Sequence, residues 1–342
     1  MTASPPVSTS DPTALEIAMP DRGLRSHGMR DLGPDEMARF RRVERAFLDV
    51  TAATGYREIR TPSIEPLHLY SASGTLSPQA LERVYSFLDW DGWSGERVVL
   101  RPDATVAVAR WYGDLRDPGV ERISYVQPVF RFAEGDREVW QCGAELFGAP
   151  ADVADAELLT LARDFLAAAG VDDVTCELAH AGLARAAFAA AGLSPQEQLS
   201  AYDRMLEGDS GITAELATTR PEGAAAVRLL ADVDGSSGGY IANLRAAMSS
   251  AIDGAEGPLD DLDGAARALD AAGVPYRILA GTARNFEYYT GVTFRFLAGG
   301  QTVLSGGRYD RLSEILGGPA APGCGWAADV RTLAEAVAGD AS

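Results

Sequence analysis

One stretch of the chain has polar side chains at the spacing that places them on one face of a β-strand. It runs from Arg137 to Glu145, and its alternate positions include Gln141, Gly143 and Glu145. Because every second residue of a strand points to the same side, the amide and the carboxylate would flank a glycine with open space above it. Such a floor suits a small ligand that carries N–H donors. An exposed sheet face with an incidental glycine accounts for the same residues.

Two further segments carry groups that bind a small zwitterion. Asp103 and Thr105 follow an apolar strand, and a carboxylate and a hydroxyl both accept hydrogen bonds from an ammonium group. Arg284 suits a bidentate pair with a carboxylate, and Tyr289 would share a strand face with Gly291, beside open space. Each segment has an ordinary alternative. Asp103 or Thr105 would cap a helix, and the tyrosine would belong to an aromatic strand packed on the core.

The segment from Ser305 to Asp310, with the sequence SGGRYD, reads as a glycine-rich loop before a helix. It lacks the GxxxxGK[ST] pattern of a P-loop and contains no GxGxxG fingerprint. A tight turn therefore explains its glycines, because glycine adopts turn conformations without steric penalty.

Metal and cofactor chemistry are not indicated. The histidines do not cluster with cysteine or carboxylate at ligand spacing; they are His27, His68 and His180. The cysteines are far apart with no CxxC spacing, so neither a disulfide framework nor a structural zinc site is expected; they are Cys142, Cys176 and Cys324. No GxSxG or HExxH motif occurs.

Hydrophobic spacing predicts the elements of the first half. After Pro34, apolar residues recur at intervals of three and four, which indicates an amphipathic helix that ends at Gly55. Strands are predicted over 56–60, 97–100, 123–132 and 137–147. The last two form an antiparallel hairpin around a turn at 133–136. A helix over 155–169 follows, with Gly170 as its C-cap.

The second half predicts a strand over 174–178, then a stretch rich in alanine, leucine and aspartate with helical patterns. Strands return at 276–279, 288–296 and 301–305, followed by helices over 309–316 and 330–337. We therefore expect an α+β fold with one mixed, mostly antiparallel sheet. The predicted organisation is a disordered lead-in over 1–20, a core made of 21–180 and 273–342, and a helical insertion over 181–272.

Composition narrows the class of partner. Of 342 residues, 46% are hydrophobic and 23% are charged, which is typical of a globular protein. The 49 acidic residues outnumber the 30 basic ones, and the formal net charge of -19 argues against a nucleic-acid partner. No run is apolar enough to span a membrane, and the first residues have no secretion signal. We expect a cytoplasmic protein without a membrane partner.

In order along the chain, five segments resemble histidyl-tRNA synthetases, which are class II aminoacyl-tRNA synthetases. They cover 55–62, 100–105, 129–145, 283–291 and 306–310, and include RxxxYYTG and GGRYD. The resemblance spans about residues 23–335 and implies the class II fold, an antiparallel sheet flanked by helices. It implies that Glu145 and Tyr289 bind an imidazole ring, and that Arg284 faces the ligand carboxylate. It also implies that Asp103, Thr105 and Gln141 hold the α-amino group, while Tyr309 lines the pocket.

The sequence departs from this family at the positions that bind the nucleotide. Arg131 matches the family's α-phosphate ligand, and with Arg137 it would form a vestigial nucleotide site. Where the family has a phosphate-binding arginine, this chain has Thr332, with Arg331 one residue away. It also has Asp329 where a glycine is expected. Loss of one preorganised donor typically lowers a rate about 10²–10³-fold. The loop at 132–137 is shorter, and no anticodon-binding domain is expected after Ser342.

A histidine pocket without an activation site resembles the regulatory subunits of ATP phosphoribosyltransferase, a branch of this family in histidine biosynthesis. The resemblance implies a non-catalytic subunit without a cofactor, a homodimer within a hetero-oligomer. Its partners would be a short catalytic subunit and free L-histidine, which mediates feedback inhibition. Two alternatives stay open. One is an enzyme that adenylates histidine for a non-tRNA acceptor, and the other is a binding paralogue that recognises a different amino acid or another partner.

Overall fold

The computed structural model describes residues 25–72, 84–90, 95–132, 135–206, 211–221, 224–231, 234–235, 238–248, 252–279 and 289–339. Two predictions lie outside these ranges: the lead-in over residues 1–20, and the position of Arg284.

The described part of the chain is organised around a nine-stranded sheet in the order β1-β5-β6-β12-β11-β10-β7-β9-β8. Its pairings are antiparallel except β1 with β5 and β7 with β9. The expected mixed, mostly antiparallel sheet is therefore confirmed. Its strands are β1 (Arg57–Glu58), β5 (Glu121–Phe130), β6 (Glu138–Phe147), β7 (Val174–His180), β8 (Asp234–Gly235), β9 (Tyr276–Leu279), β10 (Val292–Ala298), β11 (Gln301–Arg308) and β12 (Gly323–Asp329). A smaller sheet contains β2 (Ile64–Pro66), β4 (Gly95–Leu100) and β3 (Ser86–Trp90).

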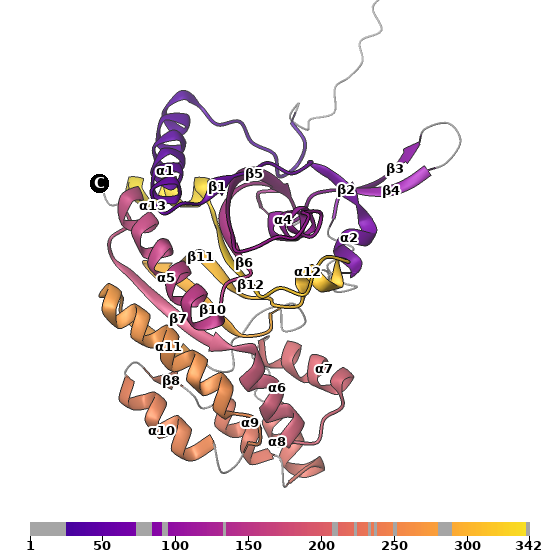
Figure 1. Ribbon diagram of the computed structural model, residues 1–342, viewed down its shortest axis with the longest axis vertical. Coiled ribbons are helices and arrows are strands. Elements are labelled where there is room, and N and C mark those ends of the chain that lie inside the picture. Colours follow the sequence, from indigo (N-terminus) through magenta and orange to yellow (C-terminus); the bar gives the residue numbers. More distant parts are fainter. Residues whose placement is uncertain are drawn as a thin grey trace, which may run out of the picture.

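Helices cover both faces of the large sheet. In Figure 1, α1, α5, α11 and α13 lie along one face, while α4 and α12 lie on the other. These helices are α1 (Pro34–Ala53), α4 (Ala104–Gly113), α5 (Ala151–Ala169), α11 (Glu256–Ala272), α12 (Leu312–Ile315) and α13 (Val330–Gly339); α2 (Leu67–Ala72) packs beside α4. The main core lies on the first face, where the rings of Phe165 and Trp326 stack with centroids 5.6 Å apart. A smaller apolar cluster fills the space between α4 and the second face.

The segment 181–272 contains helices and one two-residue strand among its described residues, at the lower end of Figure 1. The helices before α11 are α6 (Ala181–Ala190), α7 (Pro195–Leu206), α8 (Gly211–Thr219), α9 (Ala224–Ala231) and α10 (Gly238–Met248). Helix α11 packs against α5 and β7, so this segment shares contacts with the sheet. The boundaries of the predicted insertion stay a prediction.

Several predicted elements are confirmed and three need correction. The hairpin β5–β6, helix α1 and helix α5 form as expected, and Gly170 ends α5 with a φ of 88°. The predicted strand over 288–296 begins only at Val292, and the predicted helix over 309–316 shrinks to α12. The segment from Ser305 to Arg308 is part of strand β11 rather than a turn.

Strand β12 was not predicted at all. Its sequence GCGWAAD is poor in β-branched residues, and its glycines suggest a loop. Its position between β6 and β11 nevertheless makes it a central strand of the sheet.

No helix among the described residues is long and apolar enough to cross a membrane. All three cysteines are buried and free, and the described part of the chain holds no cluster of metal-ligating side chains.

Candidate functional site

The centre of the site is the carboxylate of Glu145, which is fully buried on β6. Its Oε1 accepts hydrogen bonds from the hydroxyls of Thr105 at 2.7 Å and Tyr125 at 3.0 Å. Its Oε2 accepts a hydrogen bond from the hydroxyl of Tyr309. Because three hydroxyls from α4, β5 and the end of β11 converge on it, the carboxylate is oriented before any ligand enters.

Glycines on neighbouring strands make room for these side chains. A Cβ at Gly325 would lie 1.6 Å from Oε2 of Glu145, so only glycine fits at this position of β12. A Cβ at Gly143 would lie 2.3 Å from the hydroxyl of Tyr125. The prediction of open space above Gly143 is therefore wrong, because a tyrosine from the neighbouring strand occupies that space. The prediction that Gln141 and Glu145 share one face of β6 is consistent with its ladder to β5.

Burial changes the protonation of the central carboxyl group. Desolvation raises the pKa of Glu145 to about 8, against an ordinary value of 4.5, and nearby Asp103 adds to this rise. Hydrogen bonds from Tyr309, Thr105 and Tyr125 lower the pKa and offset only part of the desolvation. The group can therefore donate a hydrogen bond when neutral, and it accepts hydrogen bonds when a cationic or N–H-donating ligand favours its ionised form.

A second polar cluster lies at the start of α4. Oδ1 of Asp103 accepts a hydrogen bond from the backbone N–H of Thr105 at 2.9 Å, so the N-cap interpretation of Asp103 is confirmed. Oε1 of Gln141 accepts the N–H of Ala104 at 3.1 Å, and its Nε2 donates to Asp103 at 3.5 Å. Asp103, Thr105 and Gln141 thus lie side by side, and Thr105 links them to Glu145.

Buried Arg101 fixes the loop that leads into α4. Its guanidinium donates to the backbone oxygens of Thr61, Pro62 and Pro128 at 2.6–2.9 Å. These bonds tie the loop to the strand β5 that carries Tyr125, and so they position Asp103 relative to the sheet.

Tyr289 lies before β10 and not within a strand as predicted. Its ring packs over β11, where a Cβ at Gly307 would lie 2.9 Å from ring atoms. Burial, together with the charges of Asp103 and Glu145, raises the pKa of the Tyr289 phenol. The predicted open space at Gly291 is wrong, since a Cβ there would lie 2.7 Å from the side chain of Arg308.

A cavity of about 350 Å³ adjoins Tyr289 and continues over β10 and β7. The residues that line it are mostly polar or small: Arg131, Glu177, Ala179, Tyr289, Thr293, Phe294, Arg295, Thr302, Ser305 and Gly306. An ion pair between Arg295 and Glu177 spans its floor. Arg131 and Tyr289 are the predicted site residues among those that line it, so the cavity offers a polar surface next to Tyr289.

The two predicted nucleotide-site arginines already have partners. The Nε of Arg131 donates to the backbone oxygen of Pro102 at 2.8 Å, and its guanidinium lies 3.5 Å from Asp103. The guanidinium of Arg137 lies 3.9 Å above the ring of Phe132 and donates to the hydroxyl of Tyr85 at 3.4 Å. Each guanidinium group therefore has part of its hydrogen-bonding capacity engaged within the chain, and this part is not available to a phosphate.

The charges at the end of β12 are also paired within the chain. Asp329 accepts hydrogen bonds from the backbone N–H of Arg331 at 3.0 Å and from the hydroxyl of Thr332 at 2.9 Å, as the N-cap of α13. Burial raises the pKa of Asp329. The guanidinium of Arg331 forms an ion pair with Asp136, in the short loop between β5 and β6.

The sequence analysis assigned no individual role to three residues that shape the site: Tyr125, Gly325 and Arg308. The alternation of side chains along β5 would have placed Tyr125 on the same face of the sheet as its partner position in β6, Gly143. Arg308 is buried beneath the site, where its guanidinium lies 2.7 Å from Asp155 and 2.9 Å from Asp310. This ion pair anchors β11 on α5, and the next residue, Tyr309, then reaches Glu145.

The fold and the site together define a class II synthetase-like protein with a buried acidic pocket. A family model described as histidyl-tRNA synthetase matches residues 28–333. In a solved structure from Bacillus halodurans C, described as an ATP phosphoribosyltransferase regulatory subunit/histidyl-tRNA synthetase, the same fold recurs with a TM-score of 0.81. That comparison covers 92% of this chain and 84% of the other at 23% identity. The expected class II fold is confirmed.

Relatives in sequence define the branch. A protein of Dehalococcoides mccartyi (strain CBDB1) is 45% identical over 307 residues, 89% of this chain and 74% of the relative. A second, from Anaeromyxobacter dehalogenans (strain 2CP-C), is 33% identical over 335 residues, 94% of this chain and 92% of the relative. Both are named ATP phosphoribosyltransferase regulatory subunit. The chain belongs to this family of histidyl-tRNA synthetase-like regulatory subunits.

Proposed function

We propose that this chain binds free L-histidine and, through it, regulates a short catalytic subunit of ATP phosphoribosyltransferase in the cytoplasm, without catalysing a reaction itself. The observation that carries the proposal is the hydrogen-bonded cluster around Glu145. There, a buried carboxyl group accepts hydrogen bonds from three hydroxyls. One of them belongs to Thr105, which lies beside the hydrogen-bonded pair Asp103 and Gln141.

The chemistry of the pocket matches each part of histidine. The imidazole ring offers an N–H donor that Glu145 accepts, and the phenol of Tyr289 lies beside it. The α-ammonium group is a triple donor, which Asp103, Thr105 and Gln141 accept at the start of α4. The α-carboxylate is assigned to Arg284 on the strength of the family resemblance.

The residues at the end of β12, where the synthetase family binds the ATP phosphates, favour a binding protein over an enzyme. Asp329 and Thr332 bond to each other, and Arg331 pairs with Asp136, so these groups are engaged within the chain. Phosphoryl-containing transition states need unpaired cationic donors aimed at the developing charge. The alternative, adenylation of histidine for a non-tRNA acceptor, is kept open by Arg131, which lines the adjoining cavity.

The test measures ATP phosphoribosyltransferase activity of the short catalytic subunit from the same organism, with and without this chain, across a histidine titration. We expect activation by the chain and inhibition by histidine, with the inhibition weakened in Glu145→Ala. Histidine-dependent exchange of pyrophosphate into ATP would instead support the adenylating enzyme. The absence of both a complex and an effect on activity would sink the regulatory proposal.

A further inference from the structure

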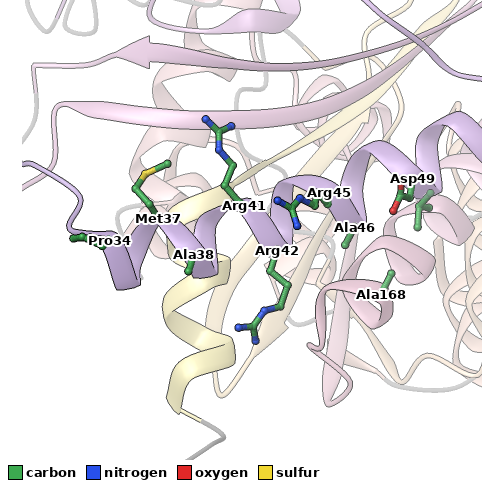
Figure 2. A pocket seen from close by; sticks show the side chains of 10 residues that line it. Pro34, Met37, Ala38, Arg41, Arg42, Arg45, Ala46, Asp49 and Ala168 are labelled. Carbon is green, nitrogen blue, oxygen red and sulfur yellow. The ribbon is translucent and has the colours of Figure 1, made fainter.

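An open groove of about 740 Å³ runs along α1, on the outer side of the helix layer. Its lining residues recur every three or four positions from Pro34 to Val50, a length of about 24 Å at the α-helical rise. Alanines and Met37 provide its apolar lining, together with Ala168 of α5. The charged residues that line it are three arginines and one aspartate: Arg41, Arg42, Arg45 and Asp49 (Figure 2).

Cationic side chains outnumber carboxylates in the lining of this groove, although acidic residues outnumber basic ones in the whole chain. The net charge is -19, yet Arg41, Arg42 and Arg45 are all exposed on one helix. Figure 2 shows Arg41 and Arg42 pointing to opposite sides of α1. Arg41 pairs with Glu44, whereas no ion pair is found for Arg42 or Arg45 among the described residues. The lining of this partly apolar groove therefore carries a net positive charge on a protein whose net charge is -19.

We propose that this groove docks an acidic amphipathic helix of the catalytic subunit, an inference that rests on the proposed function. Apolar residues of that helix would contact Met37 and the alanines, and its carboxylates would pair with the arginine guanidinium groups. Arginine suits this role because its planar fork binds carboxylates bidentately and its stem covers apolar surface. The groove's length matches a helix of four turns, laid along α1 as helices lie in apolar grooves.

Two other occupants fit less well. A second copy of this chain, joined by a closed two-fold axis through the groove, would bring the arginines of both copies together. A nucleic acid would extend its phosphates beyond the groove onto a surface of net negative charge, where repulsion opposes binding.

The test is a binding titration of this chain with the short catalytic subunit, repeated at increasing salt. The groove variant is Arg41→Glu/Arg42→Glu/Arg45→Glu. The control variant reverses three exposed arginines elsewhere, Arg228→Glu/Arg267→Glu/Arg311→Glu, and so changes the net charge equally. A third variant, Ala38→Trp, fills the groove at an exposed position without changing its charge.

We expect the groove variant to bind the catalytic subunit about tenfold or more weakly, with a smaller salt dependence, while the control variant keeps its affinity. Ala38→Trp should weaken binding with the salt dependence unchanged. Histidine binding and circular dichroism should be the same in all variants. Undiminished binding by the groove variant would overturn the docking site and leave the proposed function standing. No binding by the unaltered chain would overturn both. A shift in this chain's own oligomeric state, with catalytic-subunit binding intact, would overturn the docking site in favour of a second copy.

Discussion

Two ends of the same sheet face use polar side chains in opposite ways. At the Glu145 end, hydroxyls and an amide surround carboxyl groups that a zwitterion can engage. At the Asp329 end, each charged group already bonds to another part of the chain. The first end combines a helix cap at Asp103 with a buried carboxyl group that accepts three hydroxyls, and the second combines a helix cap with an ion pair to a loop. If the proposed function is correct, a class II fold can retain an amino-acid site while the residues at its nucleotide-binding positions bond within the chain.

The largest expected effect comes from Glu145→Ala. It removes the proposed acceptor for the imidazole ring and leaves the hydroxyls of Thr105, Tyr125 and Tyr309 without their partner. We expect histidine affinity to fall about 100-fold or more, measured by isothermal titration calorimetry. Glu138→Ala, at the start of the same strand, is the matched control and should bind like the unaltered chain. Equal affinity in the two variants would contradict the placement of the ring at Glu145.

Gly325→Ala tests the same end through the backbone of β12. The new Cβ would lie 1.6 Å from Oε2 of Glu145, so the carboxylate must leave its position. We expect histidine binding to fall about tenfold to 100-fold and the thermal midpoint to drop. The control is Gly264→Ala in α11, where nothing lies within 4 Å of an added Cβ. This control should stabilise the helix by up to about 1 kcal/mol and leave binding unchanged.

The same residue shows how far sequence reasoning reaches. Alternation along a strand is local, so the shared face of Gln141 and Glu145 could be predicted from β6 alone. The reason for Gly325 is not local, because the side chain that excludes a Cβ there comes from the neighbouring strand. Strand β12 was therefore not predicted, because the requirement for Gly325 depends on Glu145 of β6 and the requirement for Gly323 on the rings of Tyr309 and Phe147.

The hairpin β5–β6 likewise has features that follow from local sequence and features that depend on the fold. Its strands and their pairing follow from hydrophobic pattern and a short turn, and both were predicted. What fills the space above Gly143 depends on the register, which sets Tyr125 opposite that glycine. The N-cap at Asp103 was foreseen as an alternative because capping is a short-range pattern. The pairing of Arg331 with Asp136, 195 residues apart, was beyond any local pattern.

The raised pKa of Glu145 also makes the stability of the protein depend on pH. Its pKa in the folded protein, about 8, lies above the ordinary 4.5, so the folded state holds the proton more tightly than the unfolded state. Stability from this group is therefore fully present below about pH 4.5 and is lost as pH rises to about 8, at about 1.4 kcal/mol per pKa unit. In Glu145→Gln this loss disappears. Urea unfolding of both proteins without histidine, at about pH 5 and about pH 8.5, measures the difference.

In that experiment Asp155, whose pKa burial raises to about 6, contributes to both proteins and cancels in the comparison. A difference between the two proteins that stays constant across this range would contradict the raised pKa of Glu145.

Tyr309→Phe should have a smaller effect on histidine binding. It removes one of the three hydroxyls that orient the carboxylate and keeps the ring that packs near Phe147. We expect about a tenfold loss of affinity by calorimetry, the typical contribution of one hydrogen bond to a charged group. Tyr112→Phe removes a hydroxyl that bonds to the backbone of Gly119, away from the pocket, and should bind histidine normally. If both variants bound equally, the Tyr309 hydroxyl would have no role in orienting Glu145.

The smallest effect is expected at the other end. The double variant Asp329→Gly/Thr332→Arg introduces the residues that the resemblance to synthetases predicts there. It removes the cap of α13 and adds a partly exposed cation, and an exposed charge contributes little. We expect the affinity for ATP to rise by at most about fivefold, measured by equilibrium dialysis, and the affinity for histidine to stay unchanged. Asp329→Asn, which keeps a capping side chain and adds no cation, is the control. Rapid histidine-dependent pyrophosphate exchange in the double variant would contradict this expectation. It would show that these two substitutions alone restore a nucleotide site at the Asp329 end, and that the pairing of Arg331 with Asp136 does not block nucleotide binding.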